Sequence, residues 1–132
     1  MACQKIRILL ADDHPLIRQG LASFIKAEED MEIVGEATDG RDAFEKTKLL
    51  QPDIVIMDVG MPQLDGIEAT RIICSHFPQI QVIGLSMCSQ DHEGGKMRAA
   101  GAVDYLCKAG PSEAITAAIR RVAAHQMSEA VI

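Results

Sequence analysis

Short apolar segments alternate along the chain with longer segments in which apolar residues recur every three or four positions. The short runs predict strands, because a strand buried on both faces carries a nearly continuous apolar stretch. Five such runs occur, at Ile6–Ala11, Ile33–Ala37, Ile54–Met57, Val82–Ser86 and Val103–Leu106. Strands that alternate with helices are typical of repeated βα units around a parallel sheet, so the pattern predicts an α/β fold with helices on both faces of one open sheet.

The segments between these runs predict helices of unequal strength. Clear amphipathic periods cover residues 16–27, 41–50, 66–77 and 112–125. The third of these helices has a capping-box-like start at Asp65 and Glu68, and Pro78 ends it. The fourth helix is the weak element, because Gly94 and Gly95 each cost about 1 kcal/mol relative to alanine inside a helix. We expect this helix to be short, frayed or shifted.

Composition narrows the class of protein. The chain has 132 residues, of which 48% are hydrophobic, and this size suits one domain with one core. A net charge of −6, with one Tyr, three Phe and no Trp, argues against nucleic-acid binding by this segment alone, since binding phosphates requires clustered Lys and Arg. No apolar run reaches the ~20 residues of a membrane span, so we expect a cytoplasmic protein with no membrane partner.

Four cysteines, at positions 3, 74, 88 and 107, show neither a C-x-x-C pair nor a Cys/His cluster at metal-binding spacing. They therefore predict neither a zinc site nor a redox pair. We expect small buried or incidental residues with reduced thiols.

Polar residues follow the predicted strands at the point where each strand ends. Asp12 and Asp13 follow the first strand, Asp58 follows the third, Ser86 ends the fourth and Lys108 comes soon after the fifth. Each residue alone has an ordinary explanation as a helix cap, a turn residue or a solvated lysine. Together they lie on the edge of the sheet where open α/β proteins bind ligands. Clustered carboxylates repel one another unless a cation is present, and oxygen ligands of this kind suit magnesium.

Five stretches, in order and spacing, carry a family resemblance: LLADDHPLIRQGL, VGEATDGRDAF, PDIVIMDVGMPQLDGIEATR, VIGLSMCSQ and AGAVDYLCKAG. Over about residues 5–124 the sequence resembles the receiver domain of bacterial two-component response regulators. DDHPLIRQGL and VIGLSM resemble the NarL/FixJ (LuxR-type) branch in particular. The resemblance implies a flavodoxin-like, doubly wound sheet of five parallel strands in the order 2-1-3-4-5 with five helices. Residues 125–132 would begin a linker or tail.

The resemblance also implies the chemistry of the acidic residues. Asp58 would accept a phosphoryl group from the phosphohistidine of a sensor histidine kinase. Asp13, Asp58 and the backbone carbonyl of Gly60 would bind Mg²⁺ (or Mn²⁺), and Asp12 would act through a coordinated water. The chain would then be a signalling phosphoacceptor with intrinsic self-phosphorylation and self-dephosphorylation, and not a conventional enzyme.

The remaining roles concern the phosphorylated state. Ser86 and Lys108 would contact phosphoryl oxygens, and Ser86 would move together with Tyr105 to switch the surface of the fourth helix, fifth strand and fifth helix. His14 can reach the rim of the site but has no required role in the family.

Three features of the sequence depart from the family or tune its chemistry. Ala109 stands where many members carry proline, and a cis bond without proline costs about 2.5–4 kcal/mol, which puts the family's cis peptide in question. The two glycines of the fourth helix predict unusual mobility there. Gly60 has no side chain to screen attacking water, which predicts quick dephosphorylation.

Other classes fit the residues less well. A haloacid dehalogenase-type hydrolase needs a second acid two residues after its nucleophile, where this chain has Gly60. A flavodoxin-like electron carrier needs a phosphate-binding loop and flanking aromatic rings, whereas ADDHP follows the first strand. A degenerate receiver that acts without phosphorylation is disfavoured because all five expected pocket side chains are present.

The sequence alone does not decide which output this domain would control. Members of the NarL/FixJ branch usually continue into a helix-turn-helix domain that binds DNA, and this chain leaves no room for one before Ile132. We expect either the receiver part of a longer transcription regulator, in which DNA is contacted only through an absent C-terminal domain, or a natural single-domain receiver that acts through protein–protein contacts. A homodimer formed on phosphorylation is compatible with both.

Overall fold

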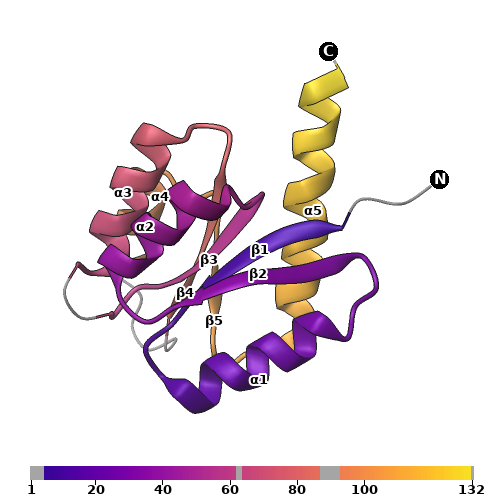
Figure 1. The fold of residues 1–132 in the computed structure, drawn as a ribbon, viewed down its shortest axis with the longest axis horizontal. Coiled ribbons are helices and arrows are strands. Elements are labelled where there is room, and N and C mark those ends of the chain that lie inside the picture. The colour runs from indigo at the N-terminus through magenta and orange to yellow at the C-terminus, as the bar shows by residue number, and fades with distance from the viewer. Residues whose placement is uncertain (1–4, 62–63, 87–92, 132) are drawn as a thin grey trace.

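The computed structural model describes residues 5–61, 64–86 and 93–131 and contains five strands and five helices in alternation (Figure 1). In chain order they are β1 (Ile6–Ala11), α1 (Pro15–Lys26), β2 (Met31–Ala37), α2 (Gly40–Leu50), β3 (Ile54–Asp58), α3 (Gly66–His76), β4 (Gln81–Ser86), α4 (Glu93–Ala100), β5 (Asp104–Cys107) and α5 (Ser112–Val131). All paired strands are parallel, in the order β2-β1-β3-β4-β5. The predicted fold class and strand order are confirmed.

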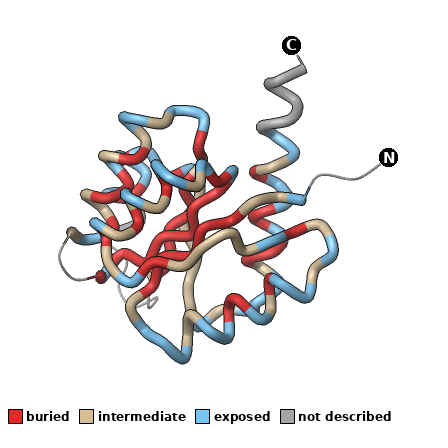
Figure 2. The backbone as a smooth tube through the Cα atoms, viewed as in Figure 1, coloured by how far each residue is buried: buried red, intermediate tan, exposed pale blue. Residues whose placement is uncertain are grey.

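The helices cover the sheet in two layers. Helices α1 and α5 lie on one face, and α2, α3 and α4 lie on the other (Figure 1). Strand β3 lies at the centre of the sheet and is buried along its whole length (Figure 2). Ile54 and Ile56 pack into the core with α1 and α5, whereas Val55 and Met57 pack into the core on the opposite face. Burial on both faces explains why this segment is apolar without alternation.

Two helices begin at aspartates that cap their first turns. Asp39 accepts a hydrogen bond from the backbone N–H of Asp42 at 2.7 Å at the start of α2. Asp65 accepts one from the backbone N–H of Glu68 at 2.9 Å at the start of α3. Each aspartate satisfies a backbone donor that has no partner within its own helix. The capped start predicted at Asp65 is confirmed.

Two element boundaries differ clearly from the predicted ones. Strand β2 begins at Met31, which is buried and pairs with Ile6; the exposed Glu32 hides this start from the apolar pattern. Within the described residues helix α4 covers Glu93–Ala100, the fewest residues of the five helices. Helix α5 continues to Val131 and does not end near His125, because the residues after the apolar stripe include no glycine or proline to stop it. No helix in the described ranges is both long enough and apolar enough to span a bilayer.

The cysteines correct one expectation. Cys107 at the end of β5 is disulfide-bonded, whereas Cys74 is a free thiol; Cys3 and Cys88 lie outside the described residues. The expectation of reduced thiols was therefore wrong for Cys107. A disulfide joins residues that the fold brings together, and no local cysteine spacing indicated it. Within the described residues no peptide bond is cis, so the bond between Lys108 and Ala109 is trans.

Helix α3 packs directly onto the end of β3 through Gly66, its first residue. The backbone N–H of Gly66 donates to the carbonyl of Val59 at 3.0 Å. A Cβ atom at Gly66 would lie 2.1 Å from the carbonyl oxygen of Asp58 and 2.8 Å from the Cα of Val59. Only glycine permits this approach, so the position of α3 is tied to the backbone that carries Asp58.

We therefore predict that Gly66→Ala destabilises the chain. The added methyl group would meet backbone atoms that cannot move independently, and overpacking of this kind costs about 1–3 kcal/mol. The matched control is Gly95→Ala in α4, where a Cβ would meet nothing within 4 Å; it should stabilise by up to about 1 kcal/mol through helix propensity. Urea unfolding measures both free energies. Equal changes in the two variants would contradict the proposed packing constraint.

Candidate functional site

Strand register brings the predicted polar residues to one edge of the sheet. Ala11 pairs with Met57, so the next residue on each strand, Asp12 and Asp58, lies beside the other. Asp58 pairs with Leu85, and Ser86 pairs with Cys107. The carboxyl ends of β1, β3, β4 and β5 therefore meet, although their residues are far apart in the sequence.

Asp12 is fully buried, and its backbone is fixed from two sides. Its N–H donates to the carbonyl of Ala37 at 3.0 Å, which ties it to β2. Its carbonyl accepts a hydrogen bond from Nη1 of Arg18 at 2.8 Å, and the Nε of Arg18 donates to Glu36 at 2.9 Å. Arg18 in α1 thus positions Asp12 without contacting its carboxylate. Arg18 lies within the motif LLADDHPLIRQGL, but nothing in the sequence indicated this role.

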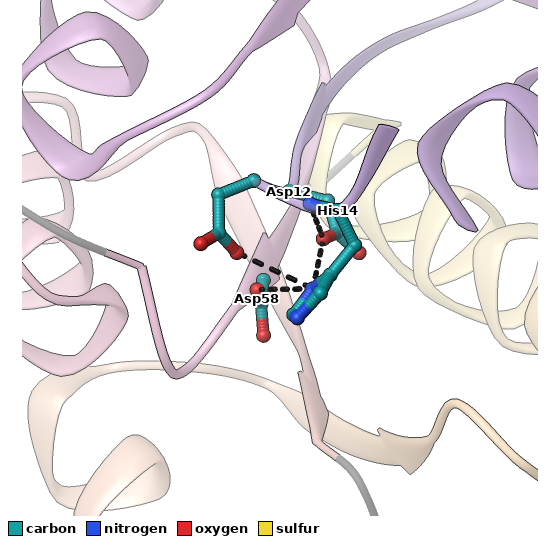
Figure 3. Close-up of side chains that lie close together, drawn as sticks. Asp12, His14 and Asp58 are labelled. Carbon is teal, nitrogen blue, oxygen red and sulfur yellow. Dashed lines mark hydrogen bonds and ion pairs between the residues drawn. The ribbon is translucent and has the colours of Figure 1, made fainter. Parts of the chain in front are cut away.

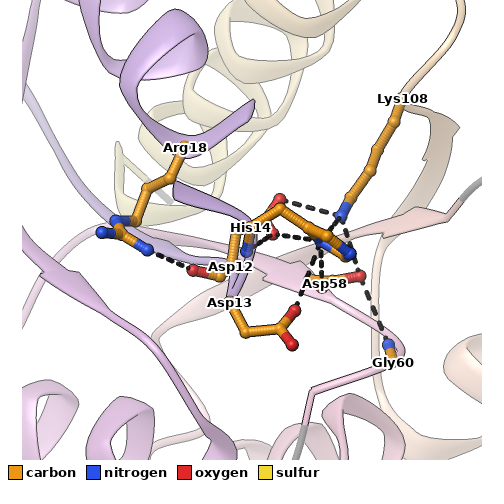
Figure 4. Close-up of polar contacts among 7 residues, drawn as sticks. All are labelled: Asp12, Asp13, His14, Arg18, Asp58, Gly60 and Lys108. Atoms are coloured by element: carbon orange, nitrogen blue, oxygen red, sulfur yellow. Dashed lines mark hydrogen bonds and ion pairs between the residues drawn. The ribbon is translucent and has the colours of Figure 1, made fainter. Parts of the chain in front are cut away.

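Lys108 bridges the two buried carboxylates (Figure 4). Its Nζ lies 2.9 Å from Oδ2 of Asp12 and 3.1 Å from Oδ1 of Asp58, and its side chain is only 3% exposed. Its backbone N–H donates to the carbonyl of Ser86 at 2.7 Å. The N–H of Gly60 also donates to Oδ1 of Asp58, at 3.3 Å. The structure thus brings together the acids, the lysine and the glycine that the sequence singled out.

His14 takes a larger part in this cluster than the sequence indicated (Figure 3). Its Nδ1 lies 2.9 Å from Oδ1 of Asp12, 3.3 Å from Oδ1 of Asp13 and 3.7 Å from Oδ2 of Asp58. The same nitrogen lies 3.2 Å from Nζ of Lys108. The only signal in the sequence was its place directly after the acid pair, which did not show which way the ring would turn.

The two buried carboxylates have pKa values shifted in opposite directions. Burial raises the pKa of Asp58, and repulsion from Asp12 adds to this, while Lys108 and the N–H of Gly60 oppose it only in part. Burial acts in the same direction on Asp12, but hydrogen bonds from Lys108 and from the backbone and ring of His14 outweigh it, so the pKa of Asp12 is lowered. The fold therefore stabilises the ionised form of Asp58 less than the ionised form of Asp12.

The cluster has the donors that a divalent cation requires. Oxygen or nitrogen atoms of Asp12, Asp13, His14 and Asp58 all lie within 4.8 Å of one another. Among the described residues, Oδ1 of Asp13 and Oδ2 of Asp58 are buried and accept no hydrogen bond. Buried carboxylate oxygens without donors are costly unless a cation neutralises them. Hard oxygen ligands of this kind fit Mg²⁺ or Mn²⁺.

The predicted switch residues lie beside this cluster. Ser86 is the last residue of β4, next to the strand that carries Asp58. Tyr105 in β5 is half-buried and packs against the core on the side of α2, α3 and α4. Its Cδ1 would lie 2.9 Å from a Cβ at Gly84, so the absence of a side chain there makes room for the ring. Their roles in switching remain predictions.

We predict that Asp58→Asn stabilises the chain at pH 7 in the presence of a chelator. Because the folded-state pKa of Asp58 is raised, the ionised carboxylate destabilises the folded state, and this cost grows as pH rises through the folded pKa. The direction of the gain follows from the raised pKa of Asp58, and its measured size reports how far that pKa is raised. The gain should shrink as pH falls toward about 4, where the unfolded carboxyl also becomes protonated.

Urea unfolding at several pH values measures this effect. Asp65→Asn is the control, because it removes a carboxylate elsewhere and keeps a residue that caps helices well; it should change stability little. A lower stability of Asp58→Asn at pH 7 would contradict the raised pKa.

Comparison with known proteins gives the family. Residues 8–120 match the model of the response regulator receiver domain. The transcriptional regulatory protein LiaR of Bacillus subtilis is 41% identical over 115 residues, which cover 87% of this chain and 54% of LiaR. The chain thus spans about half the length of this curated relative.

Two solved structures share the fold and some of the sequence. A LuxR-family two-component response regulator from Aurantimonas sp. SI85-9A1 has a TM-score of 0.81 and 30% identity, covering 98% of this chain and all of that one (100%). A LuxR-family DNA-binding response regulator from Staphylococcus aureus has a TM-score of 0.83 and 26% identity, covering 89% of this chain and 98% of that one. The family match, the relatives and the geometry agree, and this chain belongs to the response regulator receiver domains of two-component systems, in their NarL/FixJ (LuxR-type) branch.

Proposed function

We propose that this receiver domain takes a phosphoryl group from the phosphohistidine of a sensor histidine kinase onto Asp58 and passes the resulting change to an output. One observation carries the proposal. The carboxylate of Asp58 is buried between Lys108 and the acids that follow β1, and its Oδ2 accepts no hydrogen bond within the described residues.

This geometry suits a nucleophile. Lys108 and the N–H of Gly60 contact Oδ1 of Asp58, which orients the carboxylate and leaves the lone pairs of Oδ2 available. In the transfer, Oδ2 forms a bond to phosphorus while the bond from phosphorus to the histidine nitrogen of the kinase breaks. Phosphoryl transfer depends mainly on in-line positioning and on neutralising the phosphoryl oxygens. Lys108 would supply part of that positive charge, and the hydroxyl of Ser86 would donate to a phosphoryl oxygen.

The acidic cluster would hold the divalent cation that this chemistry requires. Asp13, Asp58 and the carbonyl of Gly60 would be ligands, and Asp12 would act through a bound water. Mg²⁺ supplies positive charge that offsets both the carboxylates and the incoming phosphoryl group. Asp12, held on both sides of its peptide by β2 and Arg18, would keep the cluster in a fixed geometry.

Phosphorylation would then shift a two-state element. The new negative charge at Asp58 would attract the hydroxyl of Ser86, and the ring of Tyr105 would move into the space that Ser86 leaves. The surface of α4, β5 and α5 would change as a result.

The output and the cellular location of the whole protein are further proposals, because this chain spans only about half the length of LiaR. LiaR is a transcriptional regulatory protein, and the S. aureus relative is a DNA-binding response regulator. We infer that the receiver controls DNA binding by a helix-turn-helix domain outside the chain, with a homodimer formed on phosphorylation; a single-domain receiver is the alternative. Both forms would act in the cytoplasm.

The proposal is tested with acetyl phosphate and Mg²⁺, followed by intact-mass measurement. The wild-type chain should gain one phosphoryl group, and Asp58→Ala should gain none because the nucleophile is absent. Asp65→Asn, a change at another acid that retains the helix cap, should be phosphorylated like the wild type. A phosphoryl group on Asp58→Ala, or none on the wild type, would overturn the assignment.

We also predict that Gly60→Met slows the loss of the phosphoryl group. A Cβ at Gly60 would meet nothing within 4 Å, so a side chain can occupy the space beside Asp58 and hinder attacking water. A slowing of about threefold or more, about 0.7 kcal/mol in activation free energy, is expected in the decay of phosphorylated protein. Gly20→Met adds the same side chain to an exposed site on α1 and serves as control. Equal decay of Gly60→Met and the control would refute the screening argument.

A further inference from the structure

The imidazole of His14 faces the same carboxylates that would hold the cation. We propose that His14 is a nitrogen ligand of this site, and that it makes the site bind a first-row transition-metal divalent ion, such as Mn²⁺, more tightly than Mg²⁺. The inference rests on the proposed function, because it concerns the cation of the phosphoacceptor cluster.

The orientation of His14 is set by its backbone as well as by its ring. The backbone N–H of His14 donates to Oδ1 of Asp12 at 2.9 Å, which holds the residue against the cluster. Pro15 follows as the first residue of α1 and restricts the chain further. The ring is half-exposed, with Nδ1 directed toward Asp12, Asp13 and Asp58 (Figures 3 and 4). His14 can therefore adjust around a cation without disturbing the core.

The groups around Nδ1 cannot all be satisfied by hydrogen bonds. If Nδ1 carries a proton, it faces the donor Nζ of Lys108 at 3.2 Å. If Nδ1 carries a lone pair, it faces the acceptor Oδ1 of Asp12 at 2.9 Å. Neither tautomer suits both neighbours, since a lysine ammonium only donates and a carboxylate only accepts. A divalent cation in the cluster would accept the lone pairs of the imidazole and the carboxylates together.

The carboxylate oxygens that accept no hydrogen bond are a second, independent indication of a cation in this cluster. Oδ2 of Asp58 belongs to a residue that is 3% exposed, and it accepts no hydrogen bond from the described residues. Three carboxylates alone would suit Mg²⁺, which prefers oxygen ligands and retains several waters. Adding one imidazole shifts the preference toward first-row transition metals, for which nitrogen ligands are favourable.

The rival explanation is that the ring of His14 obstructs the cluster. In that case removing the ring would strengthen the binding of Mg²⁺ and Mn²⁺ alike. His14→Phe keeps a ring of similar size but removes the nitrogen, whereas His14→Ala removes both. His76→Gln on α3 is the matched control, because His76 is exposed and bonds through Nδ1 to the carbonyl of Ile72 at 2.9 Å, away from the cluster.

Mn²⁺ and Mg²⁺ affinities are measured by calorimetry, and pulsed EPR on the Mn²⁺-loaded chain detects a coordinated ¹⁴N nucleus. The wild type and His76→Gln should show imidazole ¹⁴N modulation and bind Mn²⁺ more tightly than Mg²⁺. His14→Phe and His14→Ala should lose the modulation and bind Mn²⁺ at least about tenfold more weakly. Even the loss of a residue that only hydrogen-bonds to a metal ligand typically weakens metal binding by about that much. Their Mg²⁺ affinity should change much less.

The result separates this inference from the proposed function. Absence of ¹⁴N modulation in the wild type, or its survival in both His14 variants, overturns the ligand assignment, as does tighter binding of both ions in His14→Ala. If the wild type is still phosphorylated by acetyl phosphate on Asp58, the proposed function stands without the His14 ligand. If the wild-type chain binds Mn²⁺ with ¹⁴N modulation but accepts no phosphoryl group, His14 stands as a metal ligand and the phosphoacceptor role of Asp58 is overturned.

Discussion

Repulsion between two buried carboxylates is the constraint on which the arrangement of this site depends. Asp12 and Asp58 end neighbouring strands and are almost completely removed from water. The ammonium group of Lys108 lies within about 3 Å of both and offsets part of the repulsion. With Asp13 at the same edge, one ammonium faces three carboxylates, so the site retains a negative charge. An anionic phosphoryl group could approach such a site only if a cation accompanied it, which makes the proposed metal and the proposed phosphorylation dependent on each other.

The parallel sheet makes this crowding possible. Asp58 is carried by a strand that is buried on both faces, and the neighbouring strands supply Asp12, Ser86 and the approach to Lys108 in fixed register. Helix α3 packs so closely behind Asp58 that Gly66 has no room for a side chain. The carboxylates cannot relax apart without breaking ladder hydrogen bonds or moving a helix. Rigid backbone therefore holds charges together that would separate on a flexible loop.

The sequence predicted the fold and most of the cluster because both follow from rules of position. Apolar runs marked the strands, and the carboxyl ends of parallel strands share one edge, so the residues after each run had to meet. The direction of a side chain does not follow from such rules. His14 was placed at the rim, yet the turn into α1 directs its Nδ1 toward three acids. The disulfide of Cys107 and the extension of α5 to Val131 were missed because neither the pairing of cysteines nor the propensity of a polar helix end appears in an apolar pattern.

The unequal treatment of the two carboxylates explains how one site can hold a structural acid and a reactive one. Asp12 receives hydrogen bonds from Lys108 and from the backbone of His14, and its pKa is lowered. Asp58 has its Oδ1 contacted by Lys108 and, at 3.3 Å, by the N–H of Gly60, whereas its Oδ2 has no donor among the described residues, and burial raises its pKa. A carboxylate whose oxygens were fully hydrogen-bonded would be a poor nucleophile, because those bonds must be lost or weakened when a new bond forms. By leaving Oδ2 of Asp58 without a donor, the fold makes this acid depend on an added positive charge, and it keeps available the lone pairs that the proposed phosphoryl transfer requires.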